Sequence, residues 1–176
     1  MRWRRLGEDV DPLLLADDWS CEQNTDVSYN RCQTPEETCA DSDDEIVYTT
    51  FVPGSIVWAK QHGYPWWPAV IDYDPDSPEY FVFNNSVDPL PSKYHVAFLE
   101  EPVTRAWVCS THLKSFHRHS ADSINKKLKN ADMSLKLEGS IKMAHEALAL
   151  GIQERIRNYG FCQRYRPQKA EGPAVP

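Results

Sequence analysis

Two adjacent tryptophans between two prolines restrict the fold of this chain more than any other feature. They occur in the stretch SIVWAKQHGYPWWPAV, residues 55–70, as Trp66 and Trp67. Burying both indoles would take a large core, whereas a β-strand alternates its side chains between two faces. We therefore expect Trp66, like Trp58, to point into a barrel core, and Trp67 to lie at the rim beside Tyr64.

An aromatic rim of this kind can bind a cation. The face of an aromatic ring carries negative potential and attracts quaternary ammonium groups, with about 2 kcal/mol or more gained when the contact is desolvated. An open aromatic corner therefore suits a methylated lysine. The alternative is that the two tryptophans form an ordinary core pair in a small barrel.

The pattern of residues predicts a mainly β fold with a C-terminal α part. From Tyr48 to Phe116 the chain is rich in β-branched and aromatic residues separated by turn-forming breakers, which is typical of a small curled antiparallel barrel. The last third instead has apolar residues at helical spacing, and these predict one stripe that packs on the barrel: Leu137, Ile141, Ala144, Leu148 and Ile152. Gly151 is expected to interrupt this helix.

Charge is distributed unevenly along the chain. Residues 1–50 carry four Lys or Arg against 13 Asp or Glu, whereas residues 112–176 carry 12 against six. A basic segment gains affinity for nucleic acid by releasing counterions from the phosphate backbone. We therefore take Lys126, Lys127 and Lys129 as candidate DNA contacts. The alternative is a solvated helical face.

The cysteines favour a reducing compartment. Five of them, an odd number without a secretory signal, indicate free thiols or metal ligands rather than a disulfide scaffold. No run of apolar residues is long enough for a membrane span. Cys109 and Cys162 have no local motif that links them to a base, so we expect no enzymatic activity.

Four stretches of the barrel region resemble a PWWP domain, a member of the Royal group of chromatin readers. Residues 54–60 and 63–69 resemble its first two strands, and Lys93–Glu100 and Arg105–Val108 resemble its later strands. The resemblance implies a small SH3-like or Tudor-like barrel over residues 51–118 and a helical part over 119–165. We expect an acidic linker over 41–50 and a disordered tail over 166–176.

The resemblance also implies the walls of a methyl-lysine cage. Carried over by motif position, they are Tyr64, Trp67 and Phe98. Three π-faces can desolvate a trimethylammonium group, which has no hydrogen bond to donate. Glu100, just beyond Phe98, would favour the cation further. Leu99-Glu100 replaces a phenylalanine and a glycine found in many family members, which changes the rim of the pocket.

The N-terminal segment resembles the later part of a CW-type zinc finger in four places: Trp3–Leu6, Trp19–Asp26, Tyr29–Cys32 and Pro35–Glu37. Such a finger binds one structural Zn²⁺ through four cysteines, and its second pair has the spacing of Cys21 and Cys32. The first pair is expected upstream of Trp3 and is absent from this chain. We therefore expect residues 1–40 to be a truncated finger in which zinc binding is doubtful, because tetrahedral closure needs four ligands.

Together the two resemblances point to the small family of CW-type zinc finger and PWWP domain-containing proteins. In that family the pairing implies nuclear readers of the third core histone in germ-cell chromatin. The finger would read methylated lysine four, and the PWWP domain would read trimethylated lysine thirty-six. The expected partners are a methylated histone tail, the nucleosome and nucleosomal DNA. The alternative is a DNA-binding or scaffold domain whose cage is unused.

Overall fold

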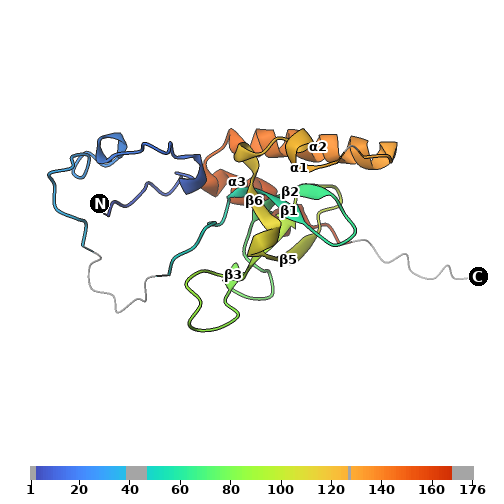
Figure 1. Cartoon of the computed structure of the whole chain (residues 1–176), viewed down its shortest axis with the longest axis horizontal. Helices are drawn as coiled ribbons and strands as arrows, with labels where there is room; N and C mark the ends of the chain where they lie inside the picture. Colours follow the sequence, from blue (N-terminus) through green and yellow to red (C-terminus); the bar gives the residue numbers. More distant parts are fainter. Residues whose placement is uncertain (1–2, 39–46, 127, 168–176) are drawn as a thin grey trace, which may run out of the picture.

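The computed structural model describes residues 3–38, 47–126 and 128–167. An N-terminal segment with two short 3₁₀ turns, η1 (Pro12–Leu14) and η2 (Cys21–Gln23), precedes a six-stranded sheet, and helices follow the sheet. Figure 1 shows this order, with the N-terminal segment in blue at one end of the molecule and the helices in orange and red above the sheet. The predicted mainly β fold with a C-terminal helical part is confirmed.

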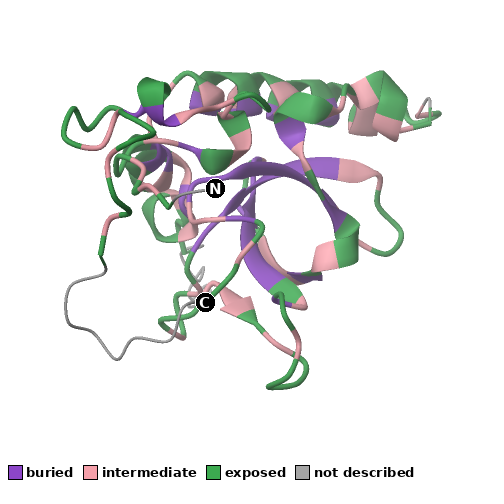
Figure 2. Ribbon diagram, turned by 60° about the vertical axis from the view of Figure 1, so that its left-hand side comes forward, coloured by how far each residue is buried: buried purple, intermediate pink, exposed green. Residues whose placement is uncertain are grey.

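The sheet is antiparallel throughout and curls into a partial barrel (Figure 2). Its strands are β1 (Ile56–Lys60), β2 (Trp66–Ile71), β3 (Phe81–Val82), β4 (Lys93–Phe98), β5 (Arg105–Cys109) and β6 (Leu113–Ser115). They follow the order β3-β4-β2-β1-β6, and β5 pairs with β4. Two 3₁₀ turns, η3 (Ser110–His112) and η4 (Phe116–Arg118), flank β6. The sheet therefore has β2 near its centre, between β1 and β4.

The alternating side chains of β2 lie on two faces of the sheet, and both faces are buried. Trp67 lies opposite Ala59, and Ala69 lies opposite Phe98, so these four side chains share the concave face of the curled sheet. Trp58 lies opposite Pro68 and shares the other face with Trp66 and Val70, while its ring stacks on Phe116 with centroids 4.8 Å apart. Both faces of the strand are therefore in contact with other parts of the fold.

The helices cover the outer face of the sheet. They are α1 (Ala121–Ile124), α2 (Ala131–Leu148), α3 (Ile152–Tyr159) and α4 (Phe161–Arg164). Asn130 caps α2 by accepting a hydrogen bond from the Met133 amide at 3.2 Å, and the predicted stripe buries Leu137 and Ala144. No helix in the described part of the chain is both long and apolar enough to cross a membrane.

The break predicted at Gly151 is confirmed, because α2 ends before it and α3 begins directly after it. Gly54, at the entry to β1, fixes how closely α3 approaches the sheet. Its φ is +89°, and a Cβ at this position would lie 2.8 Å from the Ile152 side chain and 2.9 Å from the Ile152 carbonyl oxygen. Only glycine suits both the backbone conformation and the close approach.

The expected division between the two tryptophans is wrong. Trp67 is the buried one, with 6% of its surface exposed, and Trp66 is half-buried on the outer face. The prediction failed because it assumed one buried face, whereas the barrel covers one side of β2 and the helices cover the other. Trp58 is buried as expected, but it lies under the helices, where its Nε1 donates to the His119 carbonyl at 2.9 Å.

His95 of β4 is an ionisable side chain that is completely buried. Its Nδ1 lies 2.9 Å from the Asp72 carbonyl oxygen, which can only accept, so Nδ1 carries the proton. Its Nε2 is buried without a hydrogen-bond partner among the described residues. Burial lowers the pKa of His95, and the nearby Asp72 and Asp74 only partly oppose this effect.

We predict that acid destabilises the fold through His95. The unfolded chain takes up a proton near the ordinary histidine pKa of about 6.5, whereas the folded chain resists it to lower pH. At high pH His95 is uncharged in both states, so its titration does not change the free energy of unfolding. That free energy falls as the pH drops below about 6.5. Urea unfolding at pH 7.5 and pH 5.5 should show a smaller pH-dependent loss for His95→Phe, which keeps an aromatic ring against Trp107, than for the unchanged chain. An equal loss in both proteins would contradict the assignment.

Candidate functional site

A cavity of about 400 Å³ opens at the end of the barrel between the β1–β2 turn, the β4–β5 turn and the start of α2. All three predicted cage residues, Tyr64, Trp67 and Phe98, line it. They come from different parts of the chain, and only the curled sheet brings Phe98 to the other two. The cavity is therefore the place where the predicted aromatic side chains converge.

Tyr64 stands in the turn between β1 and β2. The preceding Gly63 has a φ of +80°, a conformation that glycine adopts without strain and that allows the tight reversal. Lys60 donates to the carbonyl oxygens of Tyr64 and Gln61, which closes the turn. Tyr64 remains 58% exposed and forms the outer wall of the cavity.

Trp67 and Phe98 form the deep wall. They are 6% and 7% exposed and lie on the inner face of the sheet, so they belong both to the core and to the cavity. Arg164 of α4 holds the end of β4, because it donates to the Phe98 carbonyl at 2.9 Å and to the carbonyl of Glu100. The position of Phe98 thus depends on a helix distant in the sequence.

Ionisable side chains around the cavity leave it suited to a cation. Glu100 lines it and accepts a hydrogen bond from Thr104. Arg105 also lines it, but its guanidinium pairs with Asp74 at 2.6 Å and with Asp76 at 2.7 Å. Hydrogen bonds, first from the Asp76 amide and then from the Trp107 indole, lower the pKa of Asp74 against the opposing effect of its desolvation. The positive charge of Arg105 is therefore neutralised locally.

Two further residues reach the cavity from α2. They are Met133, which adds an apolar surface, and Lys136, whose ammonium lies 3.3 Å from Asp132. Nothing in the sequence pointed to either residue, because both lie in a helix that begins 22 residues after the end of β5, from Cys109 to Ala131. Nothing in the sequence pointed to Arg164 either, because it lies in α4, far along the chain from the end of β4 that it holds.

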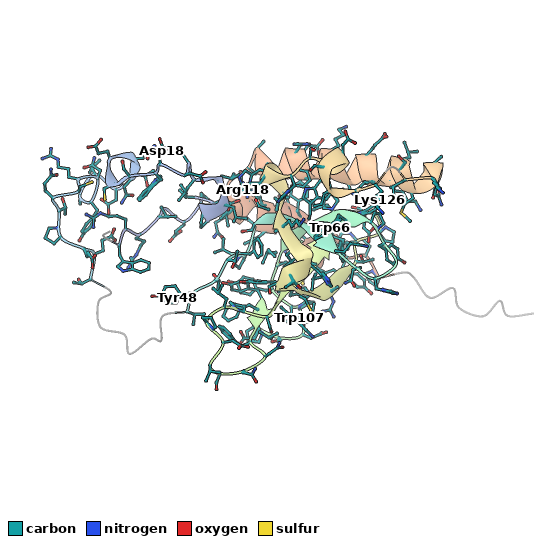
Figure 3. All side chains as sticks on the ribbon, in the orientation of Figure 1. Asp18, Tyr48, Trp66, Trp107, Arg118 and Lys126 are labelled. Atoms are coloured by element: carbon teal, nitrogen blue, oxygen red, sulfur yellow. The ribbon has the colours of Figure 1, made fainter. Side chains whose placement is uncertain are left out.

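Two of the three candidate DNA contacts, Lys126 and Lys129, are exposed between α1 and α2, and Lys127 lies outside the described residues. The Asn125 side chain anchors this segment to β2, accepting from the Trp66 amide at 2.8 Å and donating to its carbonyl at 3.0 Å. Sequence reasoning missed Lys114, whose ammonium lies 5.0 Å from the centre of the Trp66 ring. Figure 3 labels Trp66 and Lys126 on the same side of the molecule.

The N-terminal segment carries the two candidate metal ligands. Cys21 is buried, Cys32 is exposed, and both are free thiols. Arg4 instead ties the ends of this segment together by donating to the carbonyls of Arg31, Thr34 and Pro35. Residues 3–38, 47–126 and 128–167 contain no group of three or more side chains that could hold a metal ion. The described residues therefore do not supply the four ligands of a structural zinc site.

Comparison with known proteins agrees with this architecture. The PWWP domain family matches residues 54–149, and the CW-type zinc finger family matches residues 1–38. Zinc finger CW-type PWWP domain protein 1 of Mus musculus is 51% identical over 93% of this chain, and its Homo sapiens counterpart is 49% identical over 97%.

The matched region covers 26% of each of these two relatives, so the chain spans about a quarter of their length. A more distant relative, Zinc finger CW-type PWWP domain protein 2 of Homo sapiens, is 30% identical over 63% of this chain and 33% of its own length. The matches cover the curled sheet with its cavity as well as the N-terminal segment. This chain therefore belongs to the family of CW-type zinc finger and PWWP domain-containing proteins.

Proposed function

We propose that this chain is a chromatin-binding module that holds a methylated lysine in the cavity lined by Tyr64, Trp67 and Phe98. The observation that carries the proposal is that these three aromatic side chains line one cavity of about 400 Å³. Aromatic faces around a methylated ammonium group offer a cation–π interaction and exclude water from it. A long lysine side chain can reach into such a cavity from a peptide on the surface.

The charges around the cavity support a cationic ligand. Glu100 contributes a carboxylate to the wall, while Arg105 is paired with two aspartates and Lys136 with one. A cation entering the cavity would thus meet a net attraction rather than the repulsion of two free basic groups. This arrangement does not suit an anionic ligand.

We propose trimethylated lysine thirty-six of the third core histone as the ligand, in a nuclear protein without enzymatic activity. Support for this choice comes from the PWWP resemblance, since the cavity itself would accept any accessible trimethyl-lysine. Neither matched family is named for an enzymatic activity. This proposal concerns the 176-residue chain and not a longer protein, because the chain spans only part of its relatives.

We propose that DNA contacts assist binding on the side of the molecule that carries Trp66. Lys114, Lys126 and Lys129 are exposed there, and Asn125 fixes the segment that carries the latter two. The alternative, a DNA-binding or scaffold domain with an unused cavity, is favoured by the same lysines. The two differ in salt dependence, which is steep for phosphate binding and shallow for a buried cation–π interaction.

Tyr64→Ala should weaken binding of a trimethyl-lysine peptide by about tenfold or more, because a desolvated cation–π interaction is worth about 2 kcal/mol. Its melting temperature should stay near that of the unchanged chain, since Tyr64 is exposed. Trp67→Ala is a poorer test because it removes a buried indole from the core. Isothermal titration and a thermal melt measure the two effects.

Trp66→Ala is the matched control for Tyr64→Ala, because it removes an aromatic side chain that does not line the cavity. Its affinity for the free peptide should be unchanged. If both variants lose peptide binding to the same degree, or if neither does, the cavity is not the methyl-lysine site.

Changing Lys126, Lys127 and Lys129 together to Gln should weaken nucleosome binding, because these side chains would no longer neutralise DNA phosphates. The logarithmic salt slope should fall by about one for each phosphate that is no longer neutralised. Free-peptide affinity should stay nearly constant. The control removes the same charge elsewhere, by changing the exposed Lys93, Lys142 and Arg157 to Gln. Titration of reconstituted nucleosomes at several salt concentrations provides the measurement, and equal slopes for the two triple variants would refute the role of these lysines.

The purified 176-residue chain should bind zinc only weakly, because two cysteines of a four-cysteine site do not close a tetrahedral shell. Elemental analysis after dialysis against a chelator should give far less than one Zn²⁺ per chain. Adding a cysteine pair upstream of Trp3 should restore one equivalent. Chelator-resistant, stoichiometric zinc in the unextended chain would show that other residues complete the site.

A further inference from the structure

Arg155 of α3 is a buried charge with an unusual set of partners. Its side chain is only 2% exposed, and its Nη1 lies 2.6 Å from Oδ2 of Asp11, whose side chain is 3% exposed. The guanidinium also donates to the Gly54 carbonyl at 3.2 Å. Its Nε donates to the carbonyls of Ala147 and Leu150 at 3.1 and 3.0 Å. Arg155 therefore joins the end of α2, the entry to β1 and the N-terminal segment.

The ion pair gives the N-terminal segment an energetic role. A guanidinium removed from water is costly unless a carboxylate compensates its charge. Among residues 3–38, 47–126 and 128–167, the carboxylate within ion-pair distance of Arg155 is that of Asp11. If the N-terminal segment moved away, the buried charge would be left without this partner.

Asp9 makes a second tie to the same helix. Gly151 precedes α3 and has no side chain to cap it, and Oδ1 of Asp9 accepts from the Gln153 amide at 3.2 Å. A carboxylate is favourable at a helix N-terminus, where amide groups lack partners within the helix. A Cβ at Gly151 would lie 3.0 Å from that Asp9 oxygen, so the glycine also makes room for the cap.

Further interactions extend along the segment. Leu13 packs against the hydrophobic core, and Asp17 forms an exposed ion pair with Arg118 at 3.0 Å. Figure 1 shows the part of the blue segment around η1 directly beside α3. We call residues 9–17 the docking segment, because Asp9, Asp11, Leu13 and Asp17 bind it to the PWWP domain.

The family matches do not account for this interface. The CW-type zinc finger match ends at residue 38, and the PWWP match covers residues 54–149. Asp9 and Asp11 thus lie in the first match, whereas Arg155 and all of α3 lie beyond the second. The ion pair joins one module to an element outside the matched part of the other.

We propose that the docking segment holds the zinc finger module and the PWWP domain as one rigid body, rather than as two modules on a flexible linker. The consequence for chromatin rests on the function proposed above. In Figure 3, Asp18 lies in the part of the molecule formed by the first module, and Trp66 lies over the sheet of the second. In a chain whose finger is completed by an upstream cysteine pair, two binding surfaces held in this way would reinforce each other only when the two ligands are presented in a matching arrangement. Rigid docking would then select chromatin by geometry as well as by mark.

The first test compares Asp11→Asn with Asp17→Asn in the full chain. The two changes are chemically identical, but one leaves the buried Arg155 without a compensating charge and the other breaks an exposed pair. Asp11→Asn should lower the melting temperature by about 5 °C or more, and Asp17→Asn by about 1 °C or less. Equal shifts would refute the role of the ion pair.

The second test measures orientation directly, by backbone ¹⁵N relaxation in the absence of ligand. In the unchanged chain and in Asp17→Asn, residues 9–17 should give the same ratio of transverse to longitudinal rates as β1, β2 and β4. In Asp11→Asn, that ratio should fall for residues 9–17 while the sheet keeps its value. Independent tumbling of residues 9–17 in the unchanged chain would overturn the proposal.

The outcomes separate this proposal from the proposed function. Docking is measured without a peptide, and Asp11 does not line the cavity, so Asp11→Asn should keep the free-peptide affinity of the unchanged chain. Absence of peptide binding in the unchanged chain would refute the methyl-lysine function and leave the docking result standing. Normal peptide binding together with independent tumbling would refute docking alone.

Discussion

The burial of strand β2 on both faces is the constraint from which the rest of the structure follows. One face closes the barrel with Ala59 and Phe98, and the other lies under the helices with Trp58. A strand alternates its side chains, so this arrangement sends adjacent tryptophans to opposite sides. Trp67 thereby lies where the core meets the cavity, and Trp66 lies where the sheet meets the segment that carries the exposed lysines.

The C-terminal helices hold the site in place as well as covering the sheet. Arg164 fixes the carbonyls at the end of β4, and Asn125 fixes the first residue of β2. Asp72 links the end of β2 to α4, because its carboxylate accepts from the Phe161 amide at 2.7 Å. The walls of the cavity are thereby held from behind, so under the proposed function less ordering would accompany ligand binding.

The N-terminal segment has little regular structure of its own, and its interactions with the rest of the chain are mainly polar. Its two 3₁₀ turns bury one residue, Cys21. The segment nevertheless contributes Asp11 to a pair in which both side chains are almost completely buried. Such a pair specifies one arrangement of the two modules. Separating the modules would leave a buried charge without a partner, and neither module alone compensates that charge.

The sequence by itself determined the fold class, the strand region and the break at Gly151, because these depend on local periodicity and on turn-forming residues. The three candidate cage residues came from the resemblance to the PWWP domain and not from periodicity. Tertiary structure decided which tryptophan is buried, since burial depends on what covers each face of β2. It also decided that Arg105 is neutralised and that Asp11 meets Arg155. Those ion pairs join residues far apart in the chain, so no local sequence pattern predicts them.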